Sequence, residues 1–207
     1  MESGNSGRIV SIVWGLGLLP LLCLTGQTVP RADHHQHLFS PAAAALVTGD
    51  TSAPGISAHD LIALLDSAGI HRALVLSVAY TWGSANRTVD NEYEKVKAEN
   101  DWQSQQVAQY PNRLRVFCSF NPLKPYAMDE LARCARDKQL RRGLKLHFGN
   151  SDVDLDNPHN VVAVRKVFQA ANALRMPIVI HMHTSISRRR NYGRGQALVG
   201  GGDSHAG

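Results

Sequence analysis

The chain has 207 residues, of which 43% are hydrophobic and 19% charged, so it can bury the core of one domain. Its formal net charge of +5 is not arranged as a long basic stripe with interleaved aromatic residues, which argues against nucleic-acid binding. Three cysteines are too few for a disulfide scaffold, and we expect Cys118 and Cys134 to be buried free thiols.

The first 26 residues differ in composition from the rest of the chain. Arg8 precedes an apolar run over residues 9–26, which Pro20 interrupts and Thr25 and Gly26 end. A basic start, an apolar middle and small final residues are typical of a secretory signal peptide. We therefore expect residues 1–26 to be a signal peptide and the protein to be secreted or periplasmic. The alternative is an uncleaved segment that anchors the chain, although the run is marginal as a membrane span.

The first strand candidate is residues 33–37, with the sequence Asp-His-His-Gln-His. Side chains alternate between the two faces of a strand, so Asp33, His35 and His37 are expected on one face and His34 and Gln36 on the other. Two histidines two residues apart on one face form a chelating pair for a divalent metal.

Strand-like and helix-like stretches then alternate. Ser57, with Asp60 three residues on, predicts the capped start of a helix that ends near residue 69. Further helices are predicted over 91–110, 125–138 and around 161–171, and strands over 73–78, 114–120, 143–148 and 177–183. In the helix of residues 125–138, the residues expected to face the core are Met128, Leu131 and Ala135.

This alternation predicts an α/β fold with a parallel sheet and helices outside it. We expect a TIM-type (β/α) barrel of which the chain supplies the first five β/α units, over residues 27–194. A doubly wound sheet is disfavoured because no glycine-rich loop follows the first strand. Residues 195–207 are glycine-rich, and we expect an unstructured tail.

Polar residues gather where these strands end, as is usual for the functional edge of such a barrel. With the first-strand Asp-x-His-x-His, the Gly-x-Lys-x-His before Phe148 and the Pro-Ile-Val-Ile-His of residues 177–181, the chain resembles the amidohydrolase superfamily over about residues 32–192. Within it, the chain is most similar to the amidohydrolase-related metal-dependent hydrolases, a branch that also contains decarboxylases.

The resemblance implies a site with one divalent metal, most simply zinc. By resemblance its ligands are His35, His37 and His181, and neighbouring residues that would contact substrate or orient ligands are Asp33, Lys145, His147 and His183. The resemblance implies a metal-activated water that attacks an amide, ester or lactone-like bond of a small molecule. The alternatives are a metal-dependent decarboxylase on the same scaffold and a non-catalytic metal-binding remnant.

The expected sixth to eighth strands are missing, and with them the catalytic base and the last ligand that the resemblance implies. We expect a truncated fragment of a longer enzyme; the alternative is a shortened protein that folds by pairing with another chain. The oligomeric state is left open.

Overall fold

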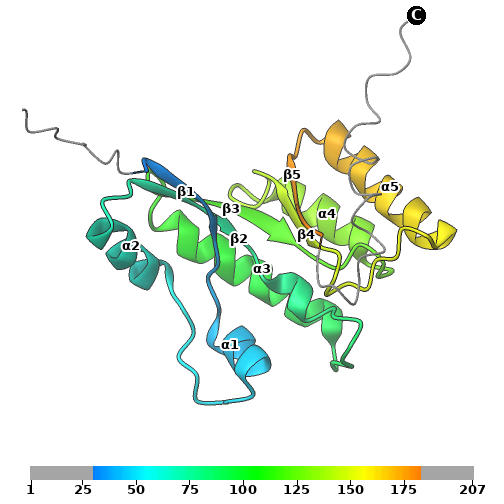
Figure 1. Cartoon of the computed structure of the whole chain (residues 1–207), viewed down its shortest axis with the longest axis horizontal. Helices are drawn as coiled ribbons and strands as arrows, with labels where there is room; N and C mark the ends of the chain where they lie inside the picture. Colours follow the sequence, from blue (N-terminus) through cyan, green and yellow to red (C-terminus); the bar gives the residue numbers. More distant parts are fainter. Residues whose placement is uncertain (1–29, 183–207) are drawn as a thin grey trace, which may run out of the picture.

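The computed structural model describes residues 30–182. Five parallel strands form one sheet in the order β1-β2-β3-β4-β5, curled into half of a barrel (Figure 1). Their bounds are Ala32–Gln36 (β1), Arg72–Leu76 (β2), Leu114–Ser119 (β3), Leu144–His147 (β4) and Ile178–His181 (β5). The sequence-based prediction of a partial (β/α) barrel is confirmed.

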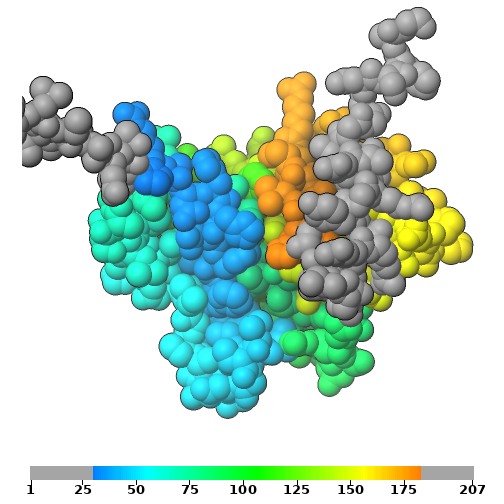
Figure 2. All heavy atoms as spheres, in the orientation of Figure 1, coloured from blue at the N-terminus to red at the C-terminus, as the bar shows by residue number. Residues whose placement is uncertain are grey.

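The helices alternate with these strands. They are α1 (Pro41–Thr48), α2 (Ala58–Ser67), α3 (Glu92–Ala108), α4 (Ala127–Arg136) and α5 (Pro158–Ala173), with a 3₁₀ turn η1 (Ala79–Thr81) after β2. Helices α2 to α5 cover one side of the sheet, and β1 and β5 are its two edges in this part of the chain. In the space-filling view, β1 in blue and β5 in orange both reach the surface of the viewed face (Figure 2).

The core lies between the sheet and these helices. Parallel strands that are covered by crossover helices carry apolar side chains toward them. Val75, Val116, Leu144 and Leu146 are fully buried there. Cys118 and Cys134 are free and buried, as predicted.

Helix α2 begins as the sequence predicts. The Ser57 hydroxyl accepts a bond from the Asp60 backbone, and the Asp60 carboxylate accepts one from the Ser57 N–H at 2.9 Å. Helix α1 was not predicted, although Ser40 caps it by accepting the Ala43 N–H at 3.1 Å and Pro41 occupies its first turn. A serine followed by proline is a helix-start signal that could have located it.

Helix α4 faces the core with Leu131 and Ala135, as expected, but not with Met128. Met128 is 41% exposed, whereas Glu130 is fully buried beside Leu131. The Glu130 carboxylate accepts bonds from Asn100 at 2.7 Å and from Arg133 at 2.8 Å, and these bonds satisfy its charge inside the protein. The prediction for Met128 is therefore wrong, because a hydrophobic pattern cannot anticipate a buried carboxylate that has partners.

Strand β1 contains a bulge that positions the histidines. Ala32 and Asp33 pair with the first two residues of β2, but the next paired residue is Gln36, opposite Val75. Three residues of β1 thus advance against two of β2, which breaks the period-two alternation. The expectation that Gln36 lies on the face opposite Asp33 is wrong: its side-chain amide donates to the Asp33 carboxylate at 2.6 Å.

Within residues 30–182, no helix combines the length and the apolar character needed to cross a membrane. The predicted signal peptide of residues 1–26 and the predicted tail of residues 195–207 lie outside the described residues.

Candidate metal and substrate site

The candidate site lies at the carboxyl edge of the sheet. Since all five strands are parallel, their carboxyl ends share one edge, where His37 follows β1 and where His147 and His181 end β4 and β5. The charges of His35, Lys145 and His181 all act on His37 and lower the pKa of its imidazole, after burial, which is the largest cause. The sheet therefore places at one edge residues that are up to about 145 positions apart in sequence.

His37 is held in a defined tautomer. Its Nδ1 atom lies 2.7 Å from the backbone carbonyl oxygen of Leu76 at the end of β2. A carbonyl can only accept, so Nδ1 must carry the proton and Nε2 keeps a free lone pair. This is the arrangement of metal-binding histidines, whose second nitrogen donates to a carbonyl or carboxylate.

His35 lies beside His37, with ring centroids 5.1 Å apart and ring planes almost perpendicular. Asp33 supports this segment rather than the rings, because its carboxylate accepts the His35 backbone N–H at 2.9 Å and the Gln36 amide. These two bonds hold the pKa of Asp33 below its ordinary value. Asp33 therefore fixes the backbone of the bulge from which His35 projects.

Lys145 is a buried lysine in the middle of β4. It is 1% exposed, and its Nζ atom has no hydrogen-bond partner in the described part of the chain. Burial lowers the pKa of this ammonium group because a low-dielectric surrounding disfavours charge. A buried amine without a partner is costly in a folded protein and is common at functional sites.

His147 is held in the opposite neutral tautomer from His37. Its Nδ1 atom accepts the backbone N–H of Asn150 at 3.0 Å, so the proton of the neutral ring is on Nε2. The ring stacks on His181, with centroids 4.1 Å apart and planes at 11°. In this tautomer Nε2 carries the proton and has no lone pair to offer a metal ion.

Two residues of this neighbourhood were not predicted. The Tyr80 ring lies 4.9 Å from that of His147, and the Asn150 side chain donates to the Tyr80 carbonyl at 3.3 Å. Burial raises the pKa of the Tyr80 hydroxyl to about 12, so it stays protonated. Tyr80 follows the carboxyl end of β2, and the rule that placed the histidines could have found it.

The donor chemistry suits a divalent metal, but the described residues supply a pair rather than a complete set. Within residues 30–182, no group of three or more His, Cys, Asp or Glu side chains is arranged to hold a metal ion. The roles of His35, His37 and His181 as ligands stay predictions. His183 lies outside the described residues.

Comparison with known proteins decides the family. The amidohydrolase family model matches residues 32–191, more than half of the chain. The chain belongs to the amidohydrolase family. No curated protein matches this amidohydrolase sequence.

Solved structures share the fold. A 5-carboxyvanillate decarboxylase from Sphingomonas paucimobilis is 20% identical, with a TM-score of 0.55, over 80% of this chain and 56% of that one. One from Novosphingobium aromaticivorans, complexed with manganese and 4-hydroxy-3-methoxy-5-nitrobenzoic acid, is 16% identical, with a TM-score of 0.58, over 84% and 56%. A 2,6-dihydroxybenzoate decarboxylase from Rhizobium is 18% identical, with a TM-score of 0.50, over 83% and 55%. This amidohydrolase chain thus spans little more than half the length of the structures it resembles.

Proposed function

We propose that this chain carries the histidine-rich part of a metal-dependent active site, and that the activity of this site is decarboxylation of a small aromatic carboxylate. The observation that carries the proposal is the bond from His37 to the Leu76 carbonyl, which leaves Nε2 available beside His35. Three of the similar solved structures are of decarboxylases, and this favours decarboxylation over the hydrolysis that the sequence motifs alone suggest.

The residues of the site divide the work by their chemistry. His35 and His37 would hold one divalent ion, zinc or manganese, with His181 as the third ligand that the family resemblance implies. The ion would polarise the oxygens of the substrate. Lys145 would face the substrate carboxylate, because its buried ammonium group lacks a counter-charge in the described residues. His147, whose ring stacks on that of His181, would lie beside the ligand.

The first experiment measures bound metal. The full chain is loaded with Mn²⁺ or Zn²⁺, desalted and analysed by elemental analysis, alongside His37→Ala and the matched control His59→Ala. His59 is exposed on α2. We expect His37→Ala to weaken metal binding by more than about tenfold and His59→Ala to leave it unchanged. Equal metal content in all three proteins would remove the proposed site.

The second experiment identifies the reaction. The metal-loaded chain is incubated with 5-carboxyvanillate and 2,6-dihydroxybenzoate, and released carbon dioxide is measured. Carbon dioxide release that His37→Ala abolishes supports the decarboxylase. Cleavage of ester or lactone substrates without carbon dioxide release would assign the metal-dependent hydrolase instead. Bound metal with neither turnover would leave a non-catalytic metal-binding protein.

A further inference from the structure

A hollow with a basic lining lies at the opposite, amino edge of the sheet. It has a volume of about 450 Å³ and is lined by three arginines from consecutive units of the fold: Arg72 of β2, Arg115 of β3 and Arg142 just before β4. From Ala32 at this edge to His37 at the other, the chain advances five residues, or roughly 16 Å of extended strand. The three arginines therefore lie away from His37, although the hollow also reaches Asp33 and His34 on the strand that carries it.

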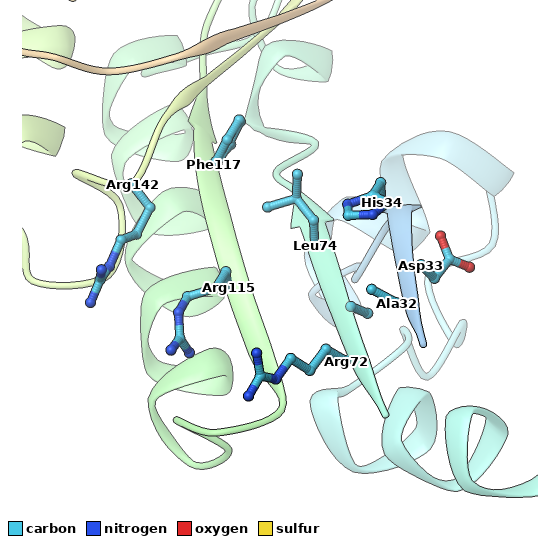
Figure 3. A pocket seen from close by; sticks show the side chains of 9 residues that line it. Ala32, Asp33, His34, Arg72, Leu74, Arg115, Phe117 and Arg142 are labelled. Atoms are coloured by element: carbon cyan, nitrogen blue, oxygen red, sulfur yellow. The ribbon is translucent and has the colours of Figure 1, made fainter. Parts of the chain in front are cut away.

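The sheet register places Arg72 and Arg115 on one face of the sheet. Leu74 pairs with Arg115, and Arg72 precedes Leu74 by two residues, so Arg72 and Arg115 are diagonal neighbours on the same face. The close-up shows both side chains reaching into the same space, with Arg142 beside them (Figure 3). His34 also lines the hollow, near Leu74.

The positive charge of this hollow is not balanced by the described residues. The ion pairs of arginine in this part of the chain are made by Arg113 and Arg133, not by the three arginines of the hollow. The one acid in the lining, Asp33, already accepts bonds from the His35 backbone and the Gln36 amide. Arg115 donates to the neutral carbonyls of Pro111 and Leu114, which leaves its charge uncompensated.

Three guanidinium groups around one hollow repel one another, and a bound anion relieves that repulsion. Guanidinium also matches the two-oxygen geometry of carboxylate and phosphate. The hollow has apolar walls as well, from Leu74 and Phe117, and its volume is that of a small-molecule site rather than of a protein interface. Arg31 and His71 line an adjoining hollow with Arg72, which extends the basic surface.

We propose that this arginine hollow binds a small oxyanion that carries two or more negative charges on phosphate or carboxylate groups. Arg72 and Arg142 contact the anion, Arg115 adds charge from the next strand, and Leu74 and Phe117 cover its uncharged part. The proposal does not depend on the reaction proposed for the histidine edge.

The test is calorimetric titration of the full chain at low ionic strength, after treatment with a chelator, with two probes. Pyrophosphate tests phosphate groups, and citrate tests carboxylate groups. We expect at least one probe to bind, and Arg72→Gln and Arg142→Gln each to weaken its binding about tenfold or more. The matched control is Arg165→Gln, on the exposed side of α5, which removes the same charge elsewhere and leaves binding unchanged.

A second measurement needs no variant. On addition of the probe, amide NMR shifts should concentrate at residues 72–74, 115–117 and 142 and spare α5. Failure of both probes to bind would overturn the proposal, as would an Arg165→Gln effect equal to that of Arg72→Gln. Binding of a poly-glutamate peptide but of neither small probe would also overturn it and assign the surface to an acidic protein partner.

Discussion

The Nδ1 atom of His37 lies 2.7 Å from the backbone carbonyl oxygen of Leu76. The bond crosses from the end of β1 to the end of β2, so the pairing of these strands sets the orientation of the imidazole. The bulge in β1 is part of the same arrangement, since it changes which residues of the strand face the helices. The geometry of the histidine edge is therefore a property of the sheet.

The stability of the protein should depend on pH through His37. Burial holds the pKa of its imidazole below the ordinary value of 6.5. As the pH falls through about 6.5, the unfolded chain takes up this proton before the folded chain does, so His37 contributes stability above that pH and loses it below. We expect the free energy of unfolding, measured by urea titration, to fall between about pH 7 and about pH 5.

The matched variants for this pH experiment are His37→Gln and His59→Gln. His37→Gln should reduce the loss of stability between the two pH values, and the exposed control His59→Gln should not. A pH profile that His37→Gln leaves as steep as that of the unchanged chain would contradict the assignment.

The different tautomers of His37 and His147 predict that their removal affects metal binding differently. His147 uses Nδ1 to accept the Asn150 N–H, whereas His37 uses Nδ1 to donate. We expect His147→Ala to keep the bound divalent metal and His37→Ala to lose it, as measured by elemental analysis after desalting. Loss of metal in His147→Ala equal to that in His37→Ala would mean that His147 is itself a ligand.

The order of elements was predictable because it depends on simple patterns. The apolar runs that became β2 to β4 are buried against helices, and the Ser57–Asp60 cap begins α2 where the sequence signals it. Helix α1 is an exception: its short alanine-rich run lacks a clear polar face, so only the Ser40–Pro41 start announces it.

The sequence predicts that histidines lie at one edge of the sheet, but not how each ring is held there. The carboxyl ends of parallel strands share one edge, which is where His37 and His181 lie. The bulge could not be read from the sequence, because it arises from pairing with β2 and no glycine marks it. The tautomers of His37 and His147 depend on the Leu76 carbonyl and the Asn150 amide, which only the folded chain brings close.

The buried carboxylate of Glu130 predicts a large effect on stability. Glu130 joins α4 to α3 through Asn100 and is paired with Arg133. Glu130→Ala would leave these partners without their acceptor inside the protein, at a cost of about 3–5 kcal/mol in the free energy of unfolding. Chemical denaturation measures this loss. The control is the exposed neighbour Asp129. Asp129→Ala should change the free energy of unfolding by less than about 0.5 kcal/mol. Comparable losses in both variants would show that the network does not hold the helices together.

The buried amine of Lys145 predicts a gain of stability on its removal. Lys145→Met keeps an unbranched chain of similar length but removes an Nζ atom that has no partner in the described residues. We expect the free energy of unfolding at neutral pH to rise by about 1–3 kcal/mol, the penalty of an unsatisfied buried polar group. Lys166→Met, on the exposed side of α5, should change it by less than about 0.5 kcal/mol.

Because burial lowers the pKa of Lys145, the unfolded chain holds this proton more tightly, and the lysine form becomes more stable as the pH rises toward 10.5. The advantage of Lys145→Met should therefore shrink in alkaline solution. A variant that is less stable than the unchanged chain at neutral pH would mean that the ammonium group is stabilised by its surroundings rather than kept for a ligand.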